Sequence, residues 1–270
     1  MPSTNKLRVA SSEFRVVRKR GLLNSKLETR NSKLPLVITI DGPAGVGKST
    51  VAKRLARRLG LVYLDTGATY RALAYAALHA KLNPITDAKQ VSRLARQLPL
   101  QFRPAPNGGV RVLLNTVDVT DRIRTEEVSE AAAQVSQDPE VRAAMVALQR
   151  RLANRHGVVV EGRDTGSVVF PHATHKFFLD ADPSIRAKRR QRELSRLYGA
   201  RPPIAQVREQ LHFRDSLDRS RRVGPLIKPP GSVTIDTSRL SASQVVQLML
   251  RHIATKPQAT GRKLQTTGRR

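Results

Sequence analysis

The chain of 270 residues contains no cysteine and no tryptophan, and aromatic residues make up only 4% of it. The absence of cysteine excludes disulfides, thiolate metal sites and a thiol nucleophile. The shortage of aromatic side chains argues against a protein that holds single-stranded nucleic acid by stacking its bases. No apolar run approaches the roughly 18 residues that a membrane helix needs, so no contact with a membrane is expected.

Acidic residues are also scarce, because 21 Asp and Glu stand against 49 Lys and Arg, which gives a net charge of +28. Residues 1–34 and 255–270 are rich in Lys, Arg, Ser and Thr, a composition typical of disordered tails. The first of these also weakly resembles an organelle transit peptide, but a mis-assigned start codon or a plain solvated basic arm is the favoured interpretation. The segment between them is basic as well. This favours either solubility with weak attraction to polyanions, or a site that neutralises several phosphates.

Residues 42–49 read G-P-A-G-V-G-K-S, a complete G-x-x-x-x-G-K-[ST] phosphate-binding loop. The glycines let successive backbone N–H groups point at phosphate oxygens, while Lys48 reaches the outer phosphates and the Ser49 hydroxyl can hold Mg²⁺. A buried-strand pattern precedes the loop, and a helical pattern that stops at Gly60 follows it. The residues predicted to bind the nucleoside triphosphate are Gly42, Pro43, Ala44, Gly45, Val46, Gly47, Lys48, Ser49 and Thr50.

Apolar strand patterns alternate with amphipathic helices over residues 35–254. This order predicts an α/β fold of the P-loop NTPase type, in which helices cover both faces of a parallel sheet. The stretch of about 98–140 departs from the pattern, and Asn107-Gly108 between β-branched segments indicates a hairpin. We therefore expect a small antiparallel sheet inserted there. A break at Gly199–Pro203 between two basic helices predicts a short lid over about 186–203.

Two predicted strands end in segments that indicate a second substrate. Y-L-D-T-G-A-T-Y-R (63–71) places Asp65 and Thr66 at a strand end, where open α/β sheets bind ligands, with Arg71 five residues beyond Thr66. The alternative is that Thr66 only caps a helix. V-V-V-E-G-R-D-T-G (158–166) leads a buried strand directly into charged residues that packing explains poorly.

Two further segments offer clusters of arginine. In H-F-R-D-S-L-D-R-S-R-R (212–222), helical spacing puts Arg214, Asp218 and Arg221 on one stripe, although a solvated face laced with ion pairs is the alternative. Arg189 and Arg190 lie beside the predicted break. Arginines near a mobile segment suit a lid that stabilises charge during phosphoryl transfer.

Taken in order, these segments resemble the bacterial cytidylate kinases, a family of P-loop nucleoside monophosphate kinases. The likeness covers about residues 35–254. The motifs that carry it are I-T-I-D-G-P-A-G-V-G-K-S-T (38–50), L-D-T-G-A-T-Y-R (64–71), I-R-T-E-E-V (123–128), E-G-R-D-T-G-S-V-V-F-P (161–171) and R-D-S-L-D-R-S-R (214–221).

The resemblance implies transfer of the γ-phosphoryl group from ATP to CMP or dCMP, with Mg²⁺ and without a covalent enzyme intermediate. Its catalytic residues would be Lys48, Arg189 and Arg190. It implies that Asp218 and Arg142 read the cytosine base and that Asp164 and Arg214 hold the ribose. The acceptor phosphate would be held by Arg71, Arg163 and Arg221, in a site that Asp65 and Thr66 line.

One position departs from the family, which often has serine where this chain has Ala133. We expect reduced affinity for the acceptor rather than a different reaction. The alternatives are another small-molecule P-loop kinase, of the shikimate or adenylate type, and an ATP-regulated nucleic-acid-binding protein. A cytoplasmic monomer is expected, in which the basic ends are dispensable for turnover and at most bind polyanions weakly.

Overall fold

The computed structural model describes residues 35–105, 110–153, 157–199 and 201–255. All of them belong to one compact unit of the chain, Leu34–Arg270. The predicted basic extension, the Asn107-Gly108 turn and all of the predicted tail except Thr255 lie outside the described residues. Within the described part, no helix combines the length and apolar character needed to cross a membrane.

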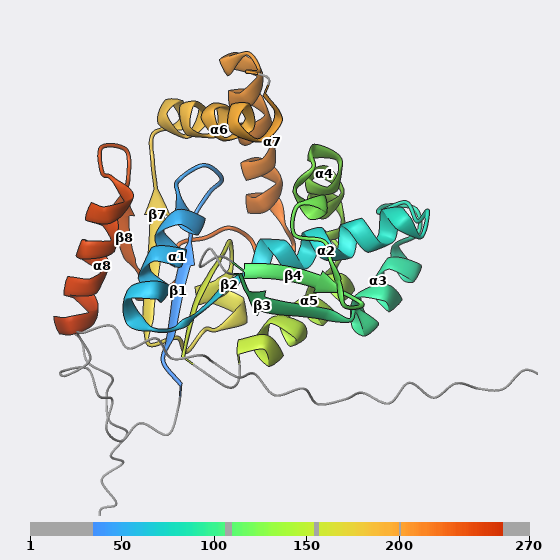
Figure 1. The fold of residues 1–270 in the computed structure, drawn as a ribbon, viewed down its shortest axis with the longest axis horizontal. Helices are drawn as coiled ribbons and strands as arrows, with labels where there is room; N and C mark the ends of the chain where they lie inside the picture. Colours follow the sequence, from blue (N-terminus) through green and yellow to red (C-terminus); the bar gives the residue numbers. More distant parts are fainter. Residues whose placement is uncertain (1–34, 106–109, 154–156, 200, 256–270) are drawn as a thin grey trace, which may run out of the picture. The chain divides into compact units, whose positions relative to one another are not determined.

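A five-stranded sheet forms the centre of this unit, with the strand order β2-β6-β1-β7-β8 (Figure 1). Its strands all run parallel: β1 (Val37–Asp41), β2 (Val62–Asp65), β6 (Val158–Gly162), β7 (His175–Asp180) and β8 (Val233–Asp236). β1 lies between β6 and β7, which suits its continuous apolar sequence. Parallel pairing sets Asp41 beside Gly162 and Asp65 beside Glu161, so the ends of three strands meet at one edge.

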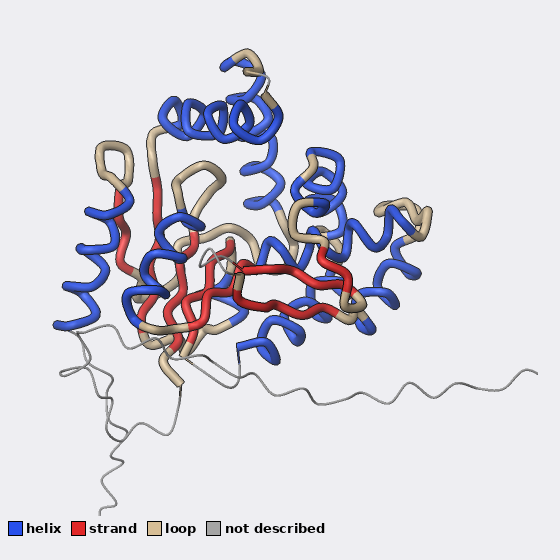
Figure 2. The backbone as a smooth tube through the Cα atoms, viewed as in Figure 1, coloured by secondary structure: helices blue, strands red, loops and turns tan. Residues whose placement is uncertain are grey.

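Helices cover both faces of the sheet, as predicted, and Figure 2 shows the strands lying between them. In β6, Val159 packs with one core while Val158 and Val160 pack with the other, because alternate side chains of a strand point to opposite faces. The core that includes Val159 contains side chains of helices α1 and α8. The core that includes Val158 and Val160 contains side chains of helices α2 and α5. These helices are α1 (Lys48–Leu59), α2 (Thr66–His79), α5 (Pro139–Ala153) and α8 (Ala242–Thr255).

A separate three-stranded antiparallel sheet confirms the inserted β region. It consists of β3 (Leu100–Pro104), β4 (Val110–Leu114) and β5 (Val117–Asp118). In the chain it is preceded by α3 (Ala88–Gln97) and followed by a short 3₁₀ helix, η1 (Arg122–Arg124), and by α4 (Glu126–Val135). α4 packs on α2, so the insert is fixed to the helix that follows β2.

The predicted lid, about residues 186–203, covers most of α6 (Pro183–Tyr198) and the break before α7 (Ile204–Ser220), and α6 and α7 are called the lid helices below. They pack on each other through a small apolar core of Ala187, Leu194, Val207 and Leu211. Two hydrogen bonds join them to the insert. The Tyr198 hydroxyl donates to the Arg124 carbonyl at 2.7 Å, and the Gln210 side-chain amide donates to the Glu126 carboxylate at 3.0 Å. The lid helices therefore contact the insert directly.

Candidate active site

The phosphate-binding loop (residues 42–49) joins β1 to α1 in the strand–loop–helix order that the sequence predicts. All three of its glycines, Gly42, Gly45 and Gly47, have positive φ. Gly42 has φ +147°, and a Cβ there would lie 2.1 Å from the Leu179 carbonyl oxygen; Gly45 has φ +79°. α1 ends at Gly60, as predicted: with φ +66° its N–H bonds to the carbonyls of Ala56 and Arg57.

Lys48 lies folded over the loop and is almost completely buried, at 7% exposure. Its ammonium group donates to the carbonyl of Pro43 at 2.6 Å. Burial lowers the pKa of Lys48 to about 7, with a smaller contribution from the positive charge of Arg163. A phosphate anion in the loop would favour the charged form of this lysine.

A cleft of about 770 Å³ opens above the loop. Of the predicted nucleotide-binding residues, those from Ala44 to Thr50 line it, whereas Gly42 and Pro43 do not. The same cleft is lined by every predicted acceptor-site residue except Arg142. Those residues are Asp65, Thr66, Arg71, Arg163, Asp164, Arg214, Asp218 and Arg221. The residues predicted for the donor half and for the acceptor half therefore line one cavity.

At the start of α2, Asp65 rather than Thr66 is the N-cap residue. The Asp65 carboxylate accepts from the Ala68 N–H at 3.0 Å and from the Arg71 guanidinium at 2.8 Å. Burial raises the pKa of Asp65, but Arg71 and the Ala68 N–H outweigh that effect and lower it below its usual value. Thr66 instead donates to the carbonyl of Glu161 at 2.7 Å. The alternative that Thr66 serves only as a cap is wrong, because its hydroxyl ties α2 to β6.

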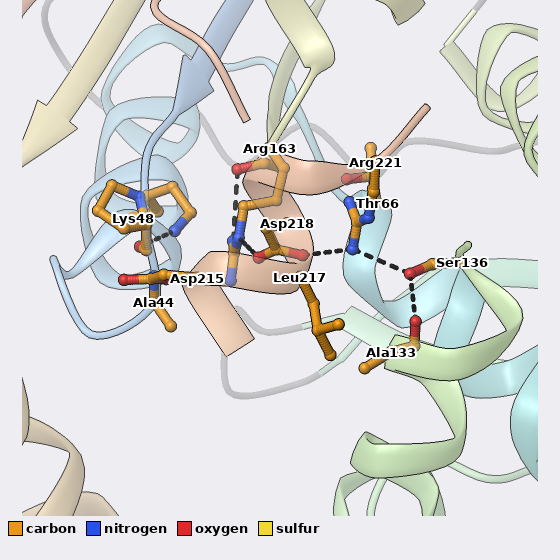
Figure 3. Close-up of polar contacts among 12 residues, drawn as sticks. Ala44, Lys48, Thr66, Ala133, Ser136, Arg163, Asp215, Leu217, Asp218 and Arg221 are labelled. Atoms are coloured by element: carbon orange, nitrogen blue, oxygen red, sulfur yellow. Dashed lines mark hydrogen bonds and ion pairs between the residues drawn. The ribbon is translucent and has the colours of Figure 1, made fainter. Parts of the chain in front are cut away.

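Asp218 on α7 lies at the centre of an ion-pair cluster, which Figure 3 shows. It accepts from Arg163 Nε at 2.7 Å and forms a second ion pair with Arg221, whose guanidinium also donates to the Ser136 hydroxyl at 2.9 Å. Asp218 is only 2% exposed. Burial raises its pKa, yet the surrounding arginines more than compensate and keep it below its usual value. The alternative of a solvated helix face is therefore wrong at this position.

Arg214 lies one turn before Asp218 and is half-buried in the cleft wall. Burial lowers the pKa of Arg214 to about 10, and the positive charge of Arg163 acts in the same direction. A guanidinium crowded by other cations gains from a bound anion, because the anion restores the missing countercharge.

Arg142 is buried behind the cleft rather than on its surface, at 1% exposure. It forms an ion pair with Asp164, which does line the cleft, and its charge lies 5.6 Å from the centre of the Tyr70 ring. Burial raises the pKa of Asp164 despite this partner. Arg142 can therefore act on a cleft ligand through Asp164 without a change in conformation.

The two predicted lid arginines both line the cleft and both have protein partners. Arg189 donates to the hydroxyl of Thr237 at 3.0 Å and to its carbonyl at 2.6 Å. Arg190 pairs with Glu193 of its own helix at 3.0 Å. Arg189 therefore anchors α6 to the loop after β8, next to the phosphate-binding loop.

The family model for cytidylate kinase matches residues 38–255. The chain belongs to the cytidylate kinase family. Cytidylate kinase of Symbiobacterium thermophilum is 45% identical over 217 residues, which cover 80% of this chain and 95% of that protein. Cytidylate kinase of Geobacillus kaustophilus is 46% identical over 219 residues (81% and 96%), and cytidylate kinase 1 of Haemophilus influenzae is 42% identical over 218 residues (81% and 93%).

Glu161 was not among the predicted site residues, although it belongs to a motif shared with the cytidylate kinases. It lies 4% exposed at the end of β6, accepts a short hydrogen bond from the Tyr63 hydroxyl and interacts with the Ser49 hydroxyl. Burial raises the pKa of Glu161, and the neighbouring Asp65 adds to the shift. Its position directly after the apolar V-V-V run (158–160) was the signal that could have identified it.

Asp41 is a second residue that the sequence did not single out, and in this cytidylate kinase family member it is fully buried. Its carboxylate accepts three hydrogen bonds at 2.7 Å each, from the N–H and hydroxyl of Thr165 and from the N–H of Gly166. Burial raises the pKa of Asp41 to about 6, against the opposing effect of these donors. Asp41 thereby fixes the backbone that follows Arg163 and Asp164.

Proposed function

We propose that this protein transfers the γ-phosphoryl group of ATP to CMP or dCMP and releases ADP with CDP or dCDP. It would thus be a phosphotransferase with a phosphate group as acceptor that supplies pyrimidine nucleotides. The observation that carries the proposal is the single cleft that joins a complete phosphate-binding loop to the Asp218 cluster. Membership of the cytidylate kinase family supports the same acceptor.

The proposed reaction is a direct displacement. A phosphate oxygen of CMP attacks the γ-phosphorus of ATP, the bond to the β,γ-bridging oxygen breaks, and the electron pair leaves with ADP. The acceptor phosphate is already an anion at neutral pH, so a general base is not required. What the protein contributes is positioning and positive charge, supplied by Lys48 with Arg189 and Arg190.

Mg²⁺ is proposed as the cofactor that neutralises charge on the donor phosphates. The Ser49 hydroxyl and the Glu161 carboxylate lie together at the loop, and hard oxygen ligands of this kind suit Mg²⁺. Among the described residues there is no group of three or more His, Cys, Asp or Glu that could hold a metal. This fits an ion whose remaining ligands are nucleotide oxygens and water.

For the acceptor, we propose that Arg71, Arg163 and Arg221 bind the phosphate of CMP. In the free protein, Asp218 neutralises two of these arginines. When the acceptor phosphate takes over that role, the Asp218 carboxylate becomes free to accept from the N4 amine of cytosine. A carboxylate in this position distinguishes cytosine from uracil, because uracil presents an acceptor at position 4.

The rest of the nucleoside would lie against the pair of Arg142 and Asp164. We propose that Asp164 and Arg214 hold the ribose. Arg142, which fixes Asp164 in the free protein, would move into the cleft to donate to N3 or O2 of cytosine. Asp65 and Thr66 would form the adjacent wall. The protein would act as a monomer in the cytoplasm, where its proposed substrates occur, with at most weak polyanion binding by the basic ends.

The test is coupled ADP release with CMP, dCMP, UMP, AMP and shikimate as acceptors at saturating ATP and Mg²⁺. The expected result is a kcat/KM for CMP or dCMP at least tenfold above that for UMP and AMP, and no turnover of shikimate. Equal rates with the three ribonucleotides would overturn the assignment of the acceptor while leaving the kinase activity in place.

A further inference from the structure

α7 carries a second buried carboxylate, Asp215, which lies next to the phosphate-binding loop (Figure 3). It is 1% exposed, and its carboxylate accepts a hydrogen bond from the backbone N–H of Ala44 at 3.1 Å. Asp218 follows one helical turn later and faces the acceptor cluster. The same helix therefore contacts both halves of the cleft through carboxylates three residues apart.

Arg186 on α6 completes this contact. Its guanidinium forms an ion pair with Asp215 and also donates to the carbonyl of Ala44 at 3.2 Å. Both backbone polar groups of one loop residue are thus bonded to a buried ion pair from the two lid helices. The packing is equally close at the next residue, because a Cβ on Gly45 would lie 3.0 Å from the Arg186 carbonyl oxygen and 3.1 Å from its Cβ.

The chemistry of this contact is unusual for a phosphate-binding loop. Backbone N–H groups in such loops ordinarily point at phosphate oxygens, and a buried carboxylate nearby repels that phosphate. A buried ion pair is in itself weak evidence for stability, since desolvation offsets much of its attraction. The pair does supply geometric specificity, because the Arg186 guanidinium and the Asp215 carboxylate together fix the position and orientation of the backbone at Ala44.

We propose that Asp215, together with Arg186, is a positioning residue that couples the acceptor site to the phosphate-binding loop. When the acceptor binds at Asp218 and Arg214, it fixes the position of α7. Because Asp215 lies on the same helix, the loop at Ala44 is then held in the geometry that the ATP phosphates need. The proposal rests on the proposed function, because it takes CMP as the ligand that fixes the position of α7.

The decisive measurement is the affinity for a non-hydrolysable ATP analogue with Mg²⁺, determined by calorimetry with and without saturating CMP. For the wild-type protein, CMP should strengthen analogue binding by about fivefold or more, the lower end of typical coupling between sites. In Asp215→Ala the ratio of the analogue affinities with and without CMP should fall to about 1. The matched control is Glu209→Gln, which removes one negative charge from an exposed position of the same helix.

Steady-state kinetics supply an independent readout. Because a small misplacement of reacting groups costs up to about a hundredfold in rate, Asp215→Ala should lower kcat by about 10- to 100-fold, while KM for CMP changes by less than about threefold. Arg186→Lys keeps the charge opposite Asp215 but loses the fork that reaches Ala44, so its kcat should lie between those of wild type and Asp215→Ala.

A merely structural role predicts a different pattern. The melting temperature of Asp215→Ala would fall, but kcat per folded molecule and the CMP-dependent ratio would match those of wild type, and this result would overturn the proposal. A wild-type ratio of 1 would overturn it as well. If the wild-type protein bound no CMP, the proposed function would fail together with this inference; normal turnover of CMP with unchanged coupling in Asp215→Ala would refute the inference alone.

Discussion

Replacement of Asp218 by asparagine tests the acceptor site most directly. The substitution preserves the size of the side chain but removes the charge that pairs with Arg163 and Arg221. If Asp218 also accepts from N4 of cytosine, the nucleotide loses a hydrogen bond to a charged group, worth about 1.5–3 kcal/mol. We therefore expect kcat/KM for CMP to fall by about 10- to 150-fold, since about 1.4 kcal/mol corresponds to a factor of ten.

The identity of the base sharpens this test. An asparagine amide can donate to O4 of uracil, so kcat/KM for UMP should fall less than that for CMP and the preference should narrow. Initial rates of coupled ADP release at saturating ATP measure both values, and Glu209→Gln on the same helix serves as the control. A change below about threefold for CMP would refute a role of Asp218 in the acceptor site. Equal losses for CMP and UMP would refute base recognition.

Four further substitutions test other parts of the molecule. Ala133→Ser restores a hydroxyl beside the cleft and should lower KM for CMP by about 2- to 10-fold at constant kcat, because one neutral hydrogen bond contributes about 0.5–1.5 kcal/mol; an unchanged KM would mean that position 133 does not touch the nucleoside. Gly42→Ala should lower the free energy of unfolding by about 3 kcal/mol or more, because its Cβ would overlap the Leu179 carbonyl. Gly199 also has positive φ, +71°, but a Cβ there would meet no atom within 4 Å. Gly199→Ala should therefore lower the free energy of unfolding by only about 1 kcal/mol, and denaturant titration measures both glycine variants. The raised pKa of Asp41, about 6 against 3.8, means that the folded state binds this proton more tightly than the unfolded chain. The free energy of unfolding of the wild type, compared with that of Asp41→Asn, should therefore fall by up to about 3 kcal/mol as pH rises from about 4 to 6. A difference in unfolding free energy that does not change with pH would contradict this.

Local sequence patterns predicted the elements of this fold because each depends on neighbouring residues. The strand, the glycine loop and the helix around residues 37–60 could be recognised from apolar periodicity and glycine spacing alone. The N-cap of α2 was harder to assign, because Asp65 and Thr66 are adjacent and both are good caps. Asp65 takes the role in the structure, while Thr66 bonds to β6.

The sequence was least informative where partners lie far apart in the chain. Helical spacing placed Asp218 on a stripe with Arg214 and Arg221, but its contact with Arg163 joins residues 55 positions apart. Asp215 lies outside that stripe, and its partner Ala44 is 171 positions away. No local pattern separates such a residue from an ordinary exposed acid on a basic helix, so its burial emerged only from the packing of α6 and α7 against the loop.

The two hydrogen bonds between the lid helices and the insert have a consequence for how substrates enter and leave. Tyr198, Gln210 and Glu126 are all exposed, so each bond competes with water and contributes about 1 kcal/mol. Together these two bonds favour the contact between the lid helices and the insert by about 2 kcal/mol, or about thirtyfold, since about 1.4 kcal/mol is a factor of ten. Each nucleotide that contacts both sides of the cleft would shift the balance further towards closure through its own contacts.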